Sequence, residues 1–183
     1  MTDASTPLIN EQSYEKTVAG IIAALAALFA ATLDPVMGEY AAHYTAPSGD
    51  ILRLGICEGA PSSYEPDALI VVASDARQTI ERPTMGRARS REITAEVEMI
   101  FSVALAGSAI SGQTARQAVN DMALQFANWL RVPGNETLSG ACREAWMSSV
   151  DGPQVTAIAG QDGQAMWGKQ AALTATITAN IRQ

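Results

Sequence analysis

Residues 91–106 have the sequence REITAEVEMIFSVALA, in which apolar and polar side chains alternate along most of the length. Alternation with a period of two predicts a β-strand with one buried and one solvated face. The expected buried side comprises Ile93, Ala95, Val97, Met99, Phe101, Val103 and Leu105. The opposite side comprises Glu92, Thr94, Glu96, Glu98, Ile100 and Ser102. A strand this long predicts that the rest of the chain is organised around a sheet.

Further strands are expected on both sides of this segment. Residues 51–57 (ILRLGIC) are a strand candidate, and residues 68–74 (ALIVVAS) are a short continuous apolar run, as expected for a strand buried on both faces. Residues 171–181 (AALTATITANI) alternate again and predict a final strand with one solvated face. Two shorter extended segments are expected around residues 145–150 and 154–159. Residues 78–80 favour extension and precede a Pro83–Gly86 turn, so with residues 91–106 they predict an extended hairpin.

Two segments show helical periodicity instead. Residues 13–33 place apolar side chains three and four positions apart, and Asp34-Pro35 is expected to end that helix. Residues 113–131 form a second amphipathic pattern, which ends at Pro133-Gly134. Residues 36–50 are expected to be a loop with some extended structure, with Tyr40 and Tyr44 packing back on the core. The expected buried face of the second helix comprises Ala115, Val119, Met122, Ala123, Phe126, Trp129 and Leu130.

The element order predicts an α+β fold: a two-layer sandwich of a mainly antiparallel sheet with two helices packed on one face and an extended β-hairpin. A length of 183 residues fits one domain. We expect residues 1–12 to form a flexible arm and residues 13–183 a single domain. Hydrophobic residues make up 48% of the chain but aromatic residues only 5%, so the core must be mostly small and aliphatic. Such a modest core fits a protein that gains further stability by oligomerisation.

Charge is distributed unevenly along the chain. The net charge is −7, which excludes nucleic-acid binding by bulk attraction. Two interpretations of a cluster of arginines in the hairpin stay open. It forms a solvated turn that protects an edge strand, or a docking arm that contacts carboxylates of a neighbouring subunit or phosphates of DNA. Carboxylates are the favoured partner because copies of this chain are acidic. The candidate interface residues are Arg77, Arg82, Arg87, Arg89 and Arg91.

The sequence offers little material for catalysis. The only histidine is His43, and the only cysteines, Cys57 and Cys142, lie far apart in the sequence. We therefore expect reduced thiols, a surface or interface position for His43, and no catalytic, cofactor-binding or metal site. Residues 18–33 carry no charge, but they are too short and too rich in alanine to predict a membrane span. We accordingly expect no enzyme activity, no cofactor and no membrane association.

With this layout the chain resembles the tail terminator (tail completion) proteins of long-tailed bacteriophages. The matching pieces are the helix at 18–33, the strand REITAEVEMIFSVALAG, the helix TARQAVNDMALQFANWL and the strand AALTATITANI. The chain departs from that layout by a longer stretch at residues 36–66. The resemblance implies a virion protein that folds in the host cytoplasm and forms a homohexameric ring. That ring would cap the head-proximal end of the tail tube, stop its polymerisation, join the head-side connector and let DNA pass without specific binding.

Three alternatives stay open. The first is another head–tail connector, neck or tail-tube component, although two substantial helices are more than a tube subunit usually carries. The second is a small enzyme that uses the carboxylates of Glu92, Glu96 and Glu98 in a concave pocket. The third is a ligand-binding module with Trp129, Trp146 and Trp167 lining a cleft.

Overall fold

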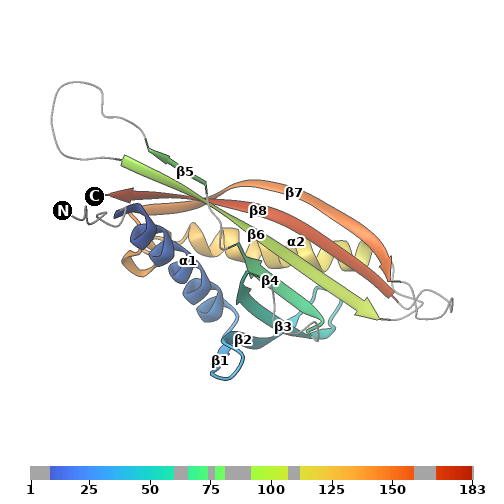
Figure 1. Ribbon diagram of the computed structural model, residues 1–183. Coiled ribbons are helices and arrows are strands. Elements are labelled where there is room, and N and C mark those ends of the chain that lie inside the picture. Colours follow the sequence, from blue (N-terminus) through green and yellow to red (C-terminus); the bar gives the residue numbers. More distant parts are fainter. Residues whose placement is uncertain are drawn as a thin grey trace, which may run out of the picture.

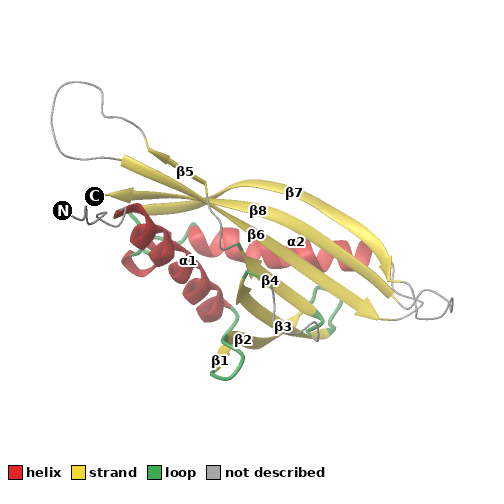
Figure 2. Cartoon of the chain, viewed as in Figure 1, coloured by secondary structure: helices red, strands yellow, loops and turns green. Residues whose placement is uncertain are grey.

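The computed structural model describes residues 9–59, 66–73, 77–80, 92–106, 112–158 and 168–182. The chain forms an α+β fold in which two main helices pack against one face of a mostly antiparallel open sheet (Figures 1 and 2). The expected fold class is confirmed. The elements are α1 (Ile9–Leu28), β1 (Thr32–Asp34), β2 (Glu39–Thr45), β3 (Ile51–Glu58), β4 (Ala68–Val72), β5 (Arg77–Ile80), β6 (Glu92–Ala106), α2 (Gly112–Leu130), the 3-10 helix η1 (Asn135–Gly140), β7 (Glu144–Ile158) and β8 (Gly168–Arg182).

The sheet has the strand order β1-β2-β3-β4-β6-β8-β7, and β5 also pairs with β6. All pairs are antiparallel except β3 and β4. The β6–β8 pair runs without a register shift from Glu92↔Arg182 to Ala106↔Gly168. Both strands of this long central pair show the alternation that the sequence predicts. The two edges of the sheet are β1 and β7.

β5 and β6 pair antiparallel and form the two arms of the expected extended hairpin. β4 and β5 follow one another along the same side of β6, with Val72 opposite Met99 and Arg77 opposite Glu96. Between them, the Ala73 N–H donates to the Glu98 carbonyl oxygen at 2.8 Å. The arms continue to Ile80↔Ile93. The turn expected at residues 83–86 lies outside the described residues.

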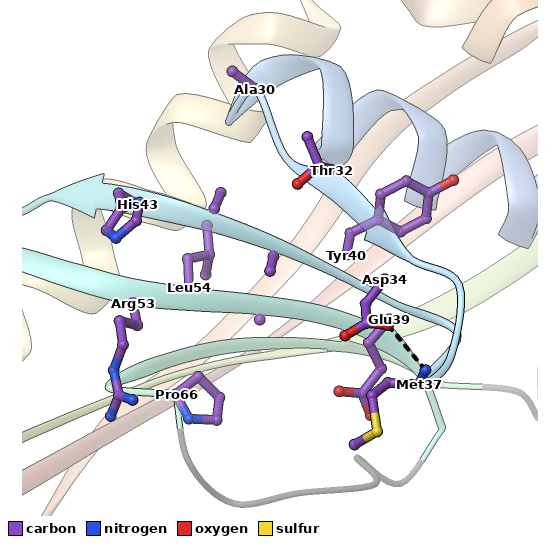
Figure 3. A pocket seen from close by; sticks show the side chains of 13 residues that line it. Ala30, Thr32, Asp34, Met37, Glu39, Tyr40, His43, Arg53, Leu54 and Pro66 are labelled. Carbon is purple, nitrogen blue, oxygen red and sulfur yellow. Dashed lines mark hydrogen bonds between the residues drawn. The ribbon is translucent and has the colours of Figure 1, made fainter.

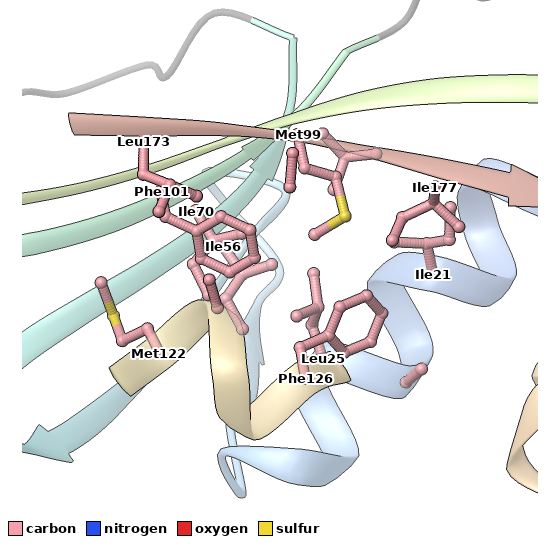
Figure 4. Packing of buried hydrophobic residues seen from close by; sticks show 14 of the residues in the cluster. Ile21, Leu25, Ile56, Ile70, Met99, Phe101, Met122, Phe126, Leu173 and Ile177 are labelled. Carbon is pink, nitrogen blue, oxygen red and sulfur yellow. The ribbon is translucent and has the colours of Figure 1, made fainter. Parts of the chain in front are cut away.

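Side chains from both layers form one core between the helices and the sheet (Figure 4). Phe101 of β6 and Phe126 of α2 are among its largest fully buried side chains, with Ile21 and Leu25 of α1 beside them. The predicted inward positions of β6 from Ala95 to Leu105 are all buried. The predicted face of α2 is buried too, except for half-buried Trp129, whose ring stacks on Phe126 at 6.2 Å between centroids.

The first helix was predicted with the wrong ends. α1 begins at Ile9 rather than at residue 13, because residues 9–12 contain no helix breaker, so these four residues of the expected arm belong to the helix. The rest of the expected arm, residues 1–8, lies outside the described residues. It ends at Leu28, well before Asp34-Pro35. Ala30 adopts φ 50°, and the Ala31 N–H donates to Ala26 O while the Ala30 N–H donates to Ala27 O. This is a Schellman motif, which ends a helix regardless of the apolar periodicity beyond it.

Two other segments differ from the sequence prediction. Residues 36–50 contain a complete strand, β2, in which Tyr44 is buried and Tyr40 packs partly against the core, as expected for both. The two extended segments expected near 145–150 and 154–159 are one strand, β7. Register shifts between Met147 and Ser149 and between Asp151 and Gln154 interrupt its alternation, so the pattern concealed its continuity.

Candidate functional site: assembly surfaces

The predicted arginine cluster is described only at its first member. Arg77 begins β5, where its register partner on β6 is Glu96. Arg82, Arg87, Arg89 and Arg91 lie outside the described residues, so the docking-arm hypothesis stays a prediction. β5 and β6 lead to and from this stretch at the end of the sheet where Glu92 pairs with Arg182. The backbone of the two arms therefore joins the cluster to the central strands of the fold.

The sheet face away from the helices carries the carboxylates considered for acid–base chemistry. Glu96 and Glu98 are exposed on β6, opposite Thr178 and Thr176 of β8. The side chain of Glu92 lies outside what the structure describes. Neither of the two hollows described below is lined by Glu96 or Glu98. Glu96 and Glu98 therefore belong to a solvated acidic strand face, which can repel phosphate groups.

The larger hollow lies beside β1, β2 and β3 and has a volume of about 600 Å³ (Figure 3). Its polar side chains support the local backbone: Asp34 Oδ1 accepts hydrogen bonds from the backbone N–H groups of Val36 at 2.8 Å and Met37 at 3.3 Å. His43 is exposed on β2, which confirms its expected surface position. The lining residues are Ala30, Thr32, Asp34, Met37, Glu39, Tyr40, Ala41, Ala42, His43, Arg53, Leu54, Gly55 and Pro66.

An ion pair borders this hollow and ties β3 to the start of β4. Arg53 donates to Asp67 Oδ2 from its Nε at 3.3 Å and from its backbone N–H at 3.1 Å. Burial would raise the pKa of Asp67, but these bonds and the Arg53 charge outweigh it and lower that pKa. The side chains are 61% and 40% exposed, so the pair contributes little to stability.

The two cysteines behave as core residues. Cys57 and Cys142 are free and buried, and burial raises the pKa of each thiol to about 11. His43 pairs with Arg53, four residues before Cys57 on β3, which places His43 and Cys57 about 13 Å apart along the strands. That separation excludes a hydrogen-bonded Cys–His pair between them. No cluster of metal-ligating side chains occurs within the residues that the structure describes.

Two groups of exposed apolar side chains lie at opposite edges of the sheet. At one edge, the turn between β1 and β2 carries Leu33, Val36 and Met37. At the other, α2 and β7 enclose a groove of about 440 Å³ that is lined in part by Leu124 and Val150. Sequence reasoning missed both surfaces, although Leu124 lies off the predicted buried face of its helix, and an off-face leucine is the signal that could have found the groove.

The two described tryptophans, Trp129 and Trp146, do not line a common cleft. Trp146 is exposed on β7, and Trp129 packs on Phe126. Neither of them lines the two hollows, and Trp167 falls in a part of the chain that the structure does not describe. No helix within the described ranges is both long and apolar enough to cross a membrane.

No protein-family model matches the sequence, and no curated protein matches it significantly. The likeness to tail terminators therefore rests on the order and type of the elements. The function has to be argued from the fold and from the surfaces at its edges.

Proposed function

We propose that the protein is a tail terminator of a long-tailed bacteriophage. Copies of the chain form a ring that caps the head-proximal end of the tail tube, stops its polymerisation and provides the head–tail joining surface. The observation that carries the proposal is the hairpin. β5 and β6 lead to the end of the sheet at Ile80 and Glu92, and four arginines occupy the sequence between those residues.

The charge pattern gives the hairpin its role in docking. The chain has a net charge of −7, so the four arginines in the sequence between β5 and β6 contrast with an acidic remainder. Guanidinium groups make bidentate hydrogen bonds to carboxylates, which adds geometric specificity to the attraction. In the proposed assembly the arginines bind carboxylates of a neighbouring virion subunit. The acidic bulk of the ring repels phosphate, so DNA passes through the channel without specific binding.

Capping follows from the way open stacks grow. A tube built from head-to-tail contacts adds subunits for as long as its end presents the same surface. A ring that matches the tube on one face and differs on the other removes that surface. The proposed role therefore needs two distinct faces, and in the described residues both main helices pack against the same face of the sheet, so its two sides differ. It needs no catalysis, cofactor or membrane.

A neighbouring role in the same structure is the runner-up. Another neck or tail-tube component would also assemble through a ring. The helices α1 and α2, of 20 and 19 residues, favour the terminator over a tube subunit, whose fold usually carries less helix.

Tube growth tests the proposal. The tail-tube protein of the same phage is polymerised alone and with this protein, and tube lengths are measured by electron microscopy. We expect shorter tubes in the mixture, and full-length tubes upon charge reversal of the Arg87 and Arg89 pair to glutamate. Arg116→Glu, on the exposed side of α2, is the matched control and should still shorten the tubes. Capping that survives the Arg87 and Arg89 reversal would overturn the docking role of the hairpin, and unchanged lengths with wild-type protein would overturn the function.

A further inference from the structure

The β1–β2 turn is an exposed apolar projection at one edge of the sheet. Val36 at its tip is 88% exposed, and Leu33 and Met37 flank it with large exposed apolar surfaces. The two N–H groups that Asp34 binds give this turn a defined shape. When a partner buries a large apolar side chain that an ordered turn holds in water, the free energy of the system falls. We call Leu33, Val36 and Met37 the apolar turn.

The α2–β7 groove is a concavity at the opposite edge. Leu124 and Val150 stand at its sides with 56% and 50% of their surfaces exposed, and buried Leu173 lies beneath them. Polar groups of Asn120, Ser148 and Ser149 also line the groove. An apolar centre with polar groups around it is the usual composition of a protein–protein interface.

Charges at the two surfaces are of opposite sign. Asp34 and Glu39 lie at either end of the apolar turn, and Arg131 lines the groove. Two copies of a chain with net charge −7 repel one another in general, so a local pairing of carboxylate with guanidinium selects the orientation in which they meet. That match is the reason to assign a second copy of this chain, rather than another protein, as the occupant of the groove.

We propose that the apolar turn of one copy docks in the α2–β7 groove of the next, forming the contact between neighbouring subunits. The contact is heterologous because the two surfaces differ, and repetition of such a contact closes into a ring when the rotation allows it. The surfaces lie on the two edge strands of a seven-strand path, about 29 Å apart. The closure into a ring rests on the proposed function, whereas the contact itself rests on these surfaces.

Pairing of edge strands is a weaker alternative for the same edges. β1 has only three residues, which limits the ladder that it could form with another strand. β7 carries two register shifts and Pro153, features that blunt an edge against strand addition. Side-chain docking in the groove avoids both obstacles.

Mixing of variants tests the contact in solution. Val36→Asp destroys the apolar turn and Leu124→Asp destroys the groove, while both positions are exposed enough to leave the fold intact. We expect closed oligomers of wild-type protein and monomers of either variant alone, measured by light scattering after size exclusion. An equimolar mixture of the two variants retains one intact surface of each kind and should give dimers that grow no further. Ile51→Asp, at a 69% exposed position on β3, is the control and should assemble normally.

The outcomes separate the contact from the function. Wild-type protein that stays monomeric, variants that assemble normally, or a mixture without dimers would each overturn the proposed contact. Circular dichroism of each variant verifies that a loss of assembly is not a loss of folding. If the mixture gives dimers but wild-type rings do not shorten tail tubes, the contact stands and the tail terminator proposal fails. If tubes are shortened although the variants assemble normally, the function stands and the contact is wrong.

Discussion

Tyr44 joins the first half of the chain to α2 through one hydroxyl group. Its ring meets the Phe29 ring edge-on at 6.2 Å. Its hydroxyl lies 2.6 Å from Asp121 Oδ2, to which it donates, and 3.1 Å from the Ala118 carbonyl oxygen. Burial, followed by the hydrogen bond to Asp121 and the charge of that residue, raises the pKa of Tyr44 far above its ordinary value. Tyr44 therefore remains a neutral donor over the whole working pH range.

Tyr44→Phe should lower the free energy of unfolding by about 1–2 kcal/mol, because partly buried Asp121 loses a donor. The loss is limited because Gln125 Nε2 still donates to the same oxygen at 2.7 Å. Denaturant unfolding measures the change. Tyr40→Phe, on the same strand, is the control and should change stability by less than about 0.5 kcal/mol. Equal effects of the two substitutions would show that the Tyr44 hydroxyl has no special role.

The thiols of Cys57 and Cys142 should be unreactive in the folded protein near neutral pH. Only the thiolate reacts, and the pKa of each thiol is raised from an ordinary 9.0 to about 11. Labelling with a chromogenic disulfide should accelerate as pH rises towards 11, and both thiols should react fast in denaturant. Because folding keeps them protonated, their contribution to stability is present below about pH 9 and is lost as pH rises through about 11. Rapid labelling of native protein at pH 8 would contradict the burial of these side chains.

At the scale of elements, the sequence predicts best where one period persists. β6, β8 and α2 follow an unbroken alternation or helical repeat, and their buried faces are as expected. The end of α1 could not be predicted, because a left-handed alanine at position 30 interrupts an apolar pattern that continues beyond it. The sequence predicts two segments in place of the single strand β7, because the register shifts of β7 break the alternation. Local backbone irregularities, which composition does not record, explain both errors.

The contact between α1 and η1 depends on the absence of a side chain at Gly20. A Cβ at this position would lie 2.9 Å from Ala141 Cβ and 3.1 Å from Leu138 Cβ. Gly20→Ala should therefore lower the free energy of unfolding by about 1–3 kcal/mol, although alanine normally stabilises a helix. Thermal unfolding of the single variant and of the Gly20→Ala, Ala141→Gly pair measures the effect, and the second change should restore part of the loss. A more stable single variant would show that the helix lies farther from η1.

At the scale of the whole molecule, the candidate site was only partly predictable. The sequence located the arginine-rich stretch and the hairpin arms that lead to it. The apolar turn and the α2–β7 groove arise from tertiary structure, since Val36 and Leu124 become conspicuous only when their exposure is known. Their positions on opposite edges of one sheet depend on the strand order, which no local pattern specifies. The surfaces proposed for assembly are therefore harder to predict than core faces.

Imaging of tail tubes tests the central claim most directly. Tubes are assembled from the tail-tube protein of the same phage in the presence of this protein, and their ends are examined by cryo-electron microscopy. The account predicts one closed ring at a single end of each tube, with adjacent subunits in contact through the apolar turn and the groove. Bare ends on full-length tubes, with the added protein still folded in solution, would contradict it.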